Sequence, residues 1–319
     1  MTDTFQTLPS GYTACRPRPD DAAAVTALIR ECELHEAGEA DTDLDAVQNT
    51  WSRPRFELIT DAWLVEAPDG TFAAYGDVWP RPNLEKLHAD GFVRPAHRGR
   101  GLGRWLVRAM EARAREMVSA AEQPRPVPLT NIVSANDTAG GELLAAEGYS
   151  PEEYFWQMRI ELAEEPPATP LPDGITVRTY QPGDERAIHA LVMTAFGDNY
   201  RHVMSPFEEW QHFLMTGDTF DPNQWFLAMD GDRIAAVALC PEYPHLGWIR
   251  QFAVARDYRR RGLGLALLHH VFRALRAIGK KSVGLGVDSY NRSNARALYE
   301  RAGMHLRHEY IAYEKVVNG

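Results

Sequence analysis

The 319-residue sequence has few cysteines, no long apolar run and no excess of positive charge. Its three cysteines, Cys15, Cys32 and Cys240, are far apart, so the chain has neither zinc-ligand spacing nor the pattern of a disulfide framework. No stretch approaches the ~20 apolar residues that a membrane-spanning helix needs. The net charge of −10 argues against nucleic acid as a main partner.

The first residues, MTDTFQTLPSGYTACRP, also lack the apolar core of a signal peptide. We therefore expect a cytoplasmic protein without a membrane or nucleic-acid partner, either a monomer or a homodimer. The apolar fraction of 45% and the charged fraction of 24% are ordinary for a globular protein. A chain of this length predicts two domains of about 150 residues each.

Two familiar phosphate-binding motifs are missing as well. The pattern G-x-x-x-x-G-K-[ST] does not occur, which excludes a P-loop. Each Gly-x-Gly that follows a predicted strand is continued by a leucine, Leu106 or Leu267, at the third glycine of the dinucleotide fingerprint. Any anion site in this chain must therefore be of another kind.

Residues 252–279 predict a strand, a basic loop with two glycines, and an amphipathic helix. The helix is indicated by apolar residues at helical spacing, namely Leu263, Leu267, Val271, Ala274 and Ile278. Backbone N–H groups at the start of a helix lack helical partners and, with the helix dipole, favour an anion. Gly262 and Gly264 let the backbone approach a phosphate closely, and the adjacent Arg259, Arg260 and Arg261 add positive charge. The stretch predicts a pyrophosphate site.

The same pattern occurs earlier, in residues 92–117. Arg98, Gly101 and Gly103 precede Arg259, Gly262 and Gly264 by a constant 161 positions. The first loop and the strand before it consist of Phe92, Val93, Arg98, Gly99, Arg100, Gly101, Leu102 and Gly103. Two such loops in one chain indicate an internal repeat.

The repeat continues beyond the loops. Asn136 and Asn291 each precede a glycine by 12 residues, in the stretches IVSANDTAGGELLAAEGY and VDSYNRSNARALYERAGM. The second stretch carries Asn294 and Tyr299, whereas the first has Ala139 and Leu144 at the corresponding positions. The two halves therefore differ in side chains that could take part in a reaction.

The pattern R-x-x-G-x-G between a strand and a helix resembles the GNAT family of acyl-CoA-dependent N-acetyltransferases. The second downstream stretch also resembles the family pattern N-x-x-[A/N]-x-x-x-Y-x-x-x-G. The resemblance covers residues 12–162 and 175–317. The predicted two-domain architecture is similar to that of mycothiol synthases. It implies acetyl-CoA as cosubstrate, bound at both loops, and no metal ion.

The resemblance also implies roles for individual residues. Tyr299 would be the general acid that protonates the departing CoA thiolate. Acetyl-CoA would be bound in the second half by Phe252, Val254, Arg259, Arg260, Arg261, Gly262, Leu263, Gly264, Asn291 and Asn294. In the first half it would be bound by Phe92, Val93, Arg98, Gly99, Arg100, Gly101, Leu102, Gly103 and Asn136.

The reaction also needs a proton acceptor and an oxyanion donor. An alkylamine has a pKa near ~10.4, so a base or a water chain must deprotonate it before it attacks the thioester. Glu242, His245 and Asp288 are the nearest candidates along the chain, and a water relay is an equal alternative. The resemblance implies that a backbone N–H within residues 252–254 stabilises the oxyanion.

Each half predicts a mixed α/β fold, with a central sheet flanked by helices. We expect an N-terminal GNAT domain at residues 1–162, closed by a strand at 154–162, and a proline-rich linker at 163–174. A C-terminal GNAT domain would follow at 175–319, with its last strand or pair of strands at 304–317. Because Tyr299 has no counterpart in the first half, the C-terminal domain is expected to be catalytic and the N-terminal one degenerate.

The leading functional hypothesis is an acetyl-CoA-dependent N-acetyltransferase that acts on a small-molecule amine. One alternative is a non-catalytic module that binds or senses an acyl-CoA. Another is a protein acetyltransferase acting on a lysine or an N-terminus. The sequence contains no recognisable code for the acceptor.

Overall fold

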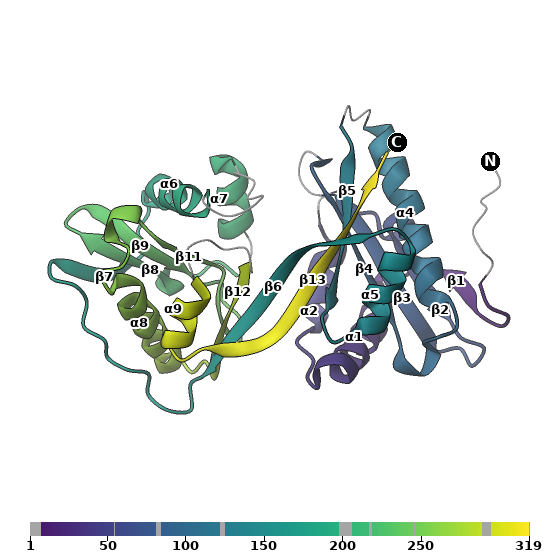
Figure 1. Ribbon diagram of the computed structural model, residues 1–319, viewed down its shortest axis with the longest axis horizontal. Helices are drawn as coiled ribbons and strands as arrows, with labels where there is room; N and C mark the ends of the chain where they lie inside the picture. The colour runs from purple at the N-terminus through teal and green to yellow at the C-terminus, as the bar shows by residue number, and fades with distance from the viewer. Residues whose placement is uncertain are drawn as a thin grey trace. The chain divides into compact units, whose positions relative to one another are not determined.

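The computed structural model describes residues 8–53, 55–80, 84–121, 125–197, 206–216, 219–244, 246–288 and 295–318 (Figure 1). The chain forms two compact units. Unit 1 comprises Met1–Tyr154 together with Glu309–Gly319, and unit 2 comprises Phe155–His308. Both units mix helices with strands, which confirms the predicted α/β class.

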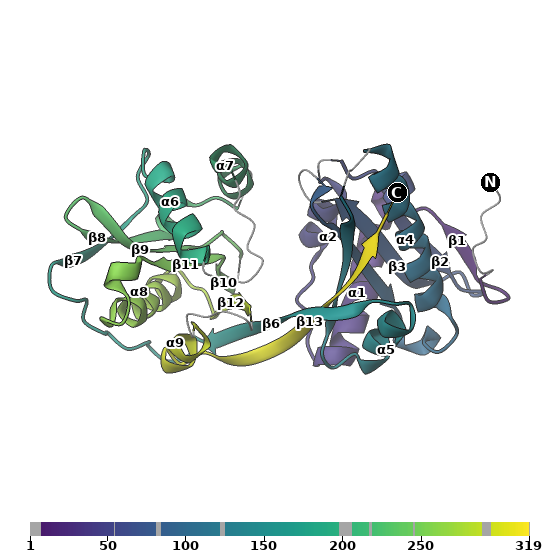
Figure 2. The same cartoon turned by 45° about the horizontal axis from the view of Figure 1, so that its top comes forward.

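Unit 1 contains one sheet, with helices on both of its faces (Figure 2). Its elements are β1 (Thr13–Cys15), α1 (Ala22–Ala37), α2 (Leu44–Trp51), α3 (Leu58–Asp61), β2 (Ala62–Glu66), β3 (Phe72–Pro80), β4 (Leu87–Val93), α4 (Leu102–Ala120), β5 (Val127–Ser134), α5 (Thr138–Ala146) and the start of β6 (Ser150–Glu161). Strands β1 to β4 pair antiparallel in chain order, and β4 then pairs parallel with β5.

The two faces of this sheet have separate apolar cores, because successive strand residues point to opposite sides. Leu64 and Tyr75 pack with α1 residues such as Leu28. Their neighbours Val65 and Ala74 pack on the other face, in the cluster that contains residues of α4. The helix that follows the first glycine loop therefore covers one face of the sheet, and α1 covers the other.

Unit 2 repeats the order of elements. After β6 come β7 (Ile175–Thr179), α6 (Glu185–Phe196), α7 (Phe207–Met215), β8 (Trp225–Asp230), β9 (Arg233–Leu239), β10 (Leu246–Ile249), β11 (Gln251–Val254), α8 (Leu263–Ala277), β12 (Ser282–Asp288), α9 (Ala295–Arg301) and the start of β13 (His305–Val317). Strands β11, β9, β8 and β7 form one sheet in that order, while β10 pairs parallel with β12. Within the described ranges of the chain, no helix has the length and apolar content needed to span a membrane.

The last strands of the two halves are exchanged between the units. Residues 155–161 of β6 pair antiparallel with β12 of unit 2, although they directly follow the first half of the chain. Residues 310–317 of β13 pair antiparallel with β5 of unit 1. The compact units therefore divide the chain differently from the boundaries 1–162 and 175–319 expected from the sequence. The alternating pattern of a strand predicts the strand itself, whereas the choice of partner is not local.

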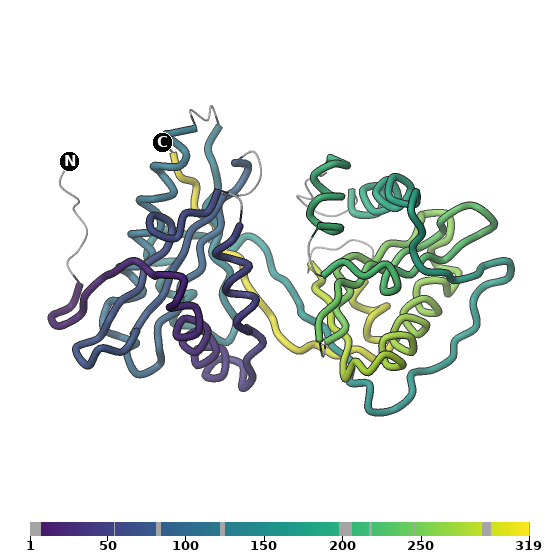
Figure 3. Tube along the Cα trace, turned by 180° about the vertical axis from the view of Figure 1, so that it is seen from behind, coloured from purple at the N-terminus to yellow at the C-terminus, as the bar shows by residue number. Residues whose placement is uncertain are grey.

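The chain passes between the units twice, once within β6 and once within β13 (Figure 3). Unit 1 is thus completed by a segment that is distant in the sequence, whereas unit 2 is continuous and begins with the strand that ends the first half of the chain. Val317, almost at the end of the chain, belongs to the apolar core that also contains Leu106 of α4 and Leu129 of β5.

Two adjacent valines provide a test of this exchange. Val317 is 2% exposed and Val316 is 58% exposed. Val317→Ala removes buried methyl groups and should lower the free energy of unfolding of unit 1 by about 2 kcal/mol. Val316→Ala is the matched control and should change it by about 0.5 kcal/mol. Urea unfolding, combined with amide hydrogen exchange of β5 and β12, measures both effects. If Val317→Ala accelerated amide hydrogen exchange in β12 rather than in β5, the assignment of the last strand to unit 1 would be contradicted.

Candidate active site

In both units, the strand that leads into the glycine loop separates from its parallel neighbour. In unit 2, β10 pairs with β12 up to Ile249, and after Arg250 the chain continues as β11, which pairs antiparallel with β9. In unit 1, residues 87–89 of β4 pair with β5, and residues 90–93 continue along β3. Strand backbone beyond the separation can offer hydrogen bonds to an extended ligand. The expected oxyanion donors, Phe252 to Val254, lie on this part of unit 2.

In each loop, the first arginine of the repeated motif holds the loop to the end of the preceding strand. The Nε atom of Arg259 donates to the carbonyl of Val254 at 3.0 Å. The Nε atom of Arg98 donates to the carbonyl of Val93 at 3.2 Å. The first arginine of the motif therefore shapes the loop, in addition to any charge that it contributes to an anion site.

The two positions in each loop require glycine for different structural reasons. Gly262 and Gly101 are the N-caps of α8 and α4 and have φ values of 83° and 86°, a left-handed conformation that favours glycine. A Cβ atom on Gly264 would lie 3.1 Å from a methyl group of Leu298. On Gly103 it would lie 2.9 Å from Leu143. The second glycine thus allows α8 and α4 to pack closely against α9 and α5, a reason that the sequence analysis did not anticipate.

The charges around the two loops differ. In unit 1, Arg98 forms ion pairs with Glu36 and, at 3.4 Å, with Asp137. Arg100 donates to the hydroxyl of Tyr12 at 2.9 Å. In unit 2, Arg260 and Arg261 are exposed. Part of the charge of the first loop is therefore already paired with carboxylates, whereas the second loop carries two exposed arginines.

Tyr299 lies on α9, only 7% exposed, with its ring against Phe252 of β11. The two ring centroids are 6.3 Å apart, at an angle of 70°. Burial raises the pKa of the Tyr299 hydroxyl, so it keeps its proton at neutral pH. The Tyr299 side chain is therefore protonated and lies beside the strand that separates from its parallel neighbour.

The backbone supports the alignment of Tyr299 with Leu144. The N–H of Met304 donates to the carbonyl of Tyr299 at 3.0 Å, and the N–H of Tyr149 donates to that of Leu144 at 3.0 Å. Both bonds close the end of a helix around a glycine with positive φ. Unit 1 thus has a buried leucine where unit 2 has a buried tyrosine.

Several other predicted residues fall elsewhere. Asn291, Asn294 and His245 lie outside the described residues. Asn136 is described, and its Nδ2 donates to the carbonyl of Glu36 at 3.2 Å.

The remaining candidates for the general base occupy different environments. Glu242 accepts a hydrogen bond from Gln224 and pairs with Lys280 at 2.6 Å. This pairing engages its carboxylate. Asp288 is half-buried at the end of β12, close in sequence to the second asparagine stretch.

A cleft of about 770 Å³ adjoins the second loop. Residues of α6, including Ala187 and Leu191, form one wall, and Val254, Arg256 and Arg259 contribute from the strand end and loop. Phe252 and Tyr299 are not among the described residues that line it. The cleft therefore approaches the loop from the side of α6, and we do not equate it with the gap beside Tyr299.

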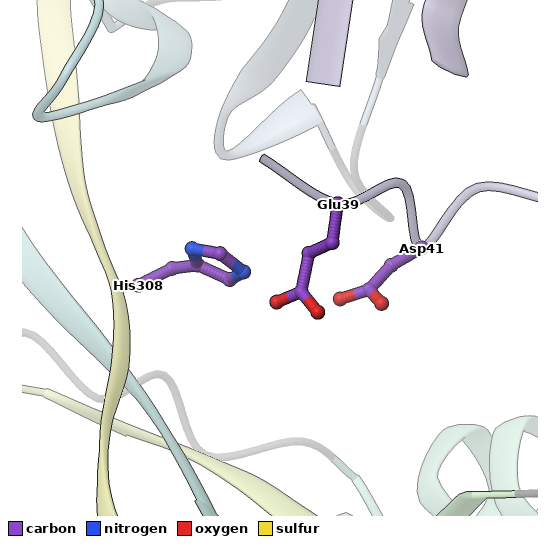
Figure 4. Close-up of side chains that lie close together, drawn as sticks. All are labelled: Glu39, Asp41 and His308. Carbon is purple, nitrogen blue, oxygen red and sulfur yellow. The ribbon is translucent and has the colours of Figure 1, made fainter. Parts of the chain in front are cut away.

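Glu39 and Asp41 form an acidic pair after α1, with neighbouring carboxylates (Figure 4). His308, also drawn in Figure 4, is the last residue of unit 2, whereas the two acids belong to unit 1. Both acids have other interactions. Because two carboxylates supply fewer ligands than a protein-bound cation needs, we assign no metal ion to them.

The sequence analysis missed a second pair of acids, Asp77 and Asp90. They lie directly opposite each other on β3 and β4. The hydroxyl of Tyr75 donates to Asp77 Oδ2 at 2.5 Å, and the indole N–H of Trp51 donates to the Tyr75 hydroxyl at 2.8 Å. The available signal was Asp90, an acid on the strand before the first loop. The strand before the second loop has no acid at the corresponding position, which is Gln251.

The surroundings of these acids favour their protonated forms. Burial, followed by the charge of Asp90, raises the pKa of Asp77 to about 7. Burial also raises the pKa of Asp90. The charge of Arg53 opposes both shifts, as does the hydrogen bond from Tyr75 at Asp77. The pair is thus held with less than its full negative charge near neutral pH.

Asp77 should make unit 1 less stable as the pH rises. The unfolded chain releases this proton near about pH 4, whereas the folded chain keeps it up to a pKa of about 7. The free energy of unfolding therefore falls across this window. Asp77→Asn should remove this part of the slope in urea unfolding curves recorded between these pH values.

The control for this pH series is Asp69→Asn. Asp69 is exposed, and hydrogen bonds from Thr71 lower its pKa, so above about pH 5 it is ionised in both the folded and the unfolded state. The Asp69 variant should keep the slope of the parent protein. An unchanged slope in Asp77→Asn would show that Asp77 does not titrate in this range.

Arg260 provides a second test. Its φ of 59° is left-handed, and the corresponding residue of the first loop is Gly99, with φ 74°. Arg260→Gly should raise the free energy of unfolding by about 1 kcal/mol, since it relieves a conformation that L-residues avoid. Arg261→Gly removes the same charge where φ is not positive. It should lower the free energy of unfolding by about 0.5 kcal/mol. Thermal unfolding measures the stability of both variants. Equal effects of the two substitutions would contradict backbone strain at Arg260.

The sequence model of the acetyltransferase (GNAT) family matches residues 22–124 and 186–304. A protein named mycothiol acetyltransferase from Thermomonospora curvata is 32% identical over 249 residues, covering 75% of this chain and 77% of that protein.

Solved structures give the same result. The crystal structure of a GCN5-related N-acetyltransferase from Sphaerobacter thermophilus is 37% identical, with a TM-score of 0.87 and 98% of each chain covered. A tandem GNAT protein from the clavulanic acid biosynthesis pathway shares the fold, with a TM-score of 0.70 at 17% identity, over 97% of this chain and 99% of that one. The two matched regions and the duplicated loop geometry lead to one conclusion: this chain belongs to the acetyltransferase (GNAT) family and is a tandem GNAT N-acetyltransferase.

Proposed function

We propose that the protein transfers an acetyl group from acetyl-CoA to a small-molecule amine and that the reaction takes place in unit 2. The observation that carries this proposal is Tyr299, a buried and protonated hydroxyl beside Phe252 of the separated strand. Unit 1 has Leu144 at the corresponding position. The name of the relatives, mycothiol acetyltransferase, favours a small acceptor over a protein.

The second loop supplies the features that a pyrophosphate requires. Gly262 caps α8 in a left-handed conformation, and the N-terminal N–H groups of a helix favour an anion. Arg260 and Arg261 add exposed positive charge at the same end of the helix. In unit 1, Arg98 is already paired with Glu36 and Asp137, so we expect weaker binding of the cosubstrate there.

The chemistry follows from these positions. A neutral amine attacks the thioester carbonyl, and a backbone N–H of β11 stabilises the charge that develops on the carbonyl oxygen. The amine loses a proton as the C–N bond forms. The C–S bond then breaks, and the thiolate takes a proton from the Tyr299 hydroxyl. The raised pKa of Tyr299 keeps that proton available until the thiolate forms.

Glu242 is engaged by Lys280, which favours a water relay over this side chain as the first proton acceptor. In the described part of unit 2, β10 and β11 carry no acid. The proton of the amine would then leave along water molecules in the gap between the strands.

The test is Tyr299→Phe, assayed as thiol release from acetyl-CoA with a panel of primary amines, with product masses confirming acetylation. Loss of the proton donor should lower kcat by about 100-fold or more, while KM for acetyl-CoA changes little. Tyr149→Phe is the matched control, because Tyr149 is a buried tyrosine of unit 1. Its activity should equal that of the parent enzyme. Full activity in Tyr299→Phe, or an equal loss in both variants, would contradict the assignment to unit 2.

A further inference from the structure

We propose that unit 1 has a binding site of its own for a small molecule that carries an ammonium group next to an oxygen acceptor, as in an amino alcohol or an amino sugar. The site is formed by Asp77, Trp79 and Arg53, with Asp90 facing Asp77. It does not depend on where acetyl transfer takes place. It is therefore separate from the proposed function of unit 2.

The first observation is a set of buried polar atoms without partners. Among the described residues, Asp77 Oδ1, Trp79 Nε1 and an Nη atom of Arg53 are buried and make no hydrogen bond. Asp77 itself is 2% exposed. A buried polar group that lacks a partner lowers stability, so such groups are uncommon and call for an explanation. Three of them in one cluster indicate that a ligand can satisfy them together.

The residues that carry these three atoms are neighbours. Asp77 and Trp79 are two residues apart on β3 and therefore point to the same face of the sheet. The guanidinium of Arg53 lies 3.9 Å from the centroid of the Trp79 ring. Its charge also acts on both Asp77 and Asp90. His88 stacks on Trp79 from β4, with ring centroids 4.5 Å apart.

The orientation of Asp77 is fixed by the same network. Its Oδ2 atom accepts from the Tyr75 hydroxyl, which in turn accepts from the indole of Trp51. Oδ1 is thereby left for another donor. When both carboxyl groups are ionised, they face the single guanidinium of Arg53, so an ammonium group would balance the second negative charge.

The chemistry of the unpartnered atoms defines the ligand class. When Asp77 is ionised, its Oδ1 atom requires a donor, and an ammonium group supplies one together with a positive charge that favours this ionised form. Trp79 Nε1 and the Arg53 Nη atom require an acceptor, and a hydroxyl or ether oxygen next to the ammonium supplies it. An alkylamine without the oxygen satisfies only Asp77, and a diol without the ammonium leaves Arg53 as the counter-charge for both acids.

Ethanolamine is the smallest probe with both groups. Isothermal titration and thermal shift of the full-length protein should show saturable binding of ethanolamine. Ethylamine should bind at least tenfold more weakly, and ethylene glycol should not bind. Asp77→Asn should abolish ethanolamine binding, whereas the exposed control Asp69→Asn should retain it. Because the first substitution lies in unit 1, binding of the probe to an acceptor site of unit 2 would persist in Asp77→Asn and overturn the proposal.

A second variant separates recognition from folding. Trp79→Phe keeps an aromatic ring for Arg53 and His88 but removes the indole N–H. It should bring the affinity for ethanolamine close to that for ethylamine, and leave ethylamine binding unchanged. Asp77→Asn should also melt at a temperature no lower than the parent protein near neutral pH, since it removes one of two opposed carboxylates. A lower melting temperature, together with no ethanolamine binding by the parent protein, would assign the cluster a purely structural role.

Discussion

In both units, the hydrogen bonds between two parallel strands stop partway along the loop strand, and the rest of the candidate active site depends on this separation. Pairing ends at Ile249 in unit 2 and at Ala89 in unit 1. Beyond these points the loop strand pairs with its antiparallel neighbour. One side of the strand backbone is thus available to a ligand, while the other side is hydrogen-bonded to the antiparallel neighbour. The glycine loop and its helix follow directly, so the pyrophosphate site that we propose would lie at the end of the same gap.

The two units retain different parts of a common arrangement. Unit 2 has a protonated hydroxyl at Tyr299 and two exposed arginines in its loop, but no acid on β10 or β11. Unit 1 has the opposed acids Asp77 and Asp90 and a leucine in place of the tyrosine. Its loop arginine is paired with carboxylates. A duplicated fold can therefore specialise by keeping chemistry in one copy and polar recognition in the other.

The sequence was informative where function depends on local pattern. The glycine loops, the helices that follow them and the alignment of Tyr299 with Leu144 could be predicted because fixed spacing along the chain carries them. The packing of Gly264 against Leu298 could not, because it depends on a contact between two helices. Asp77 was missed because its importance arises from the register that places it opposite Asp90. The partners of the last two strands were missed for the same reason, since pairing is decided by the whole sheet.

The exchange of terminal strands bears on how a duplicated gene can evolve. After duplication, a redundant copy is ordinarily free to decay or to be deleted. Here, loss of either half would also remove residues 155–161 from unit 2 or residues 310–317 from unit 1, and leave the surviving sheet with an open edge. Selection for the reaction that we propose for unit 2 would therefore also preserve unit 1, and a preserved unit has time to acquire a ligand of its own.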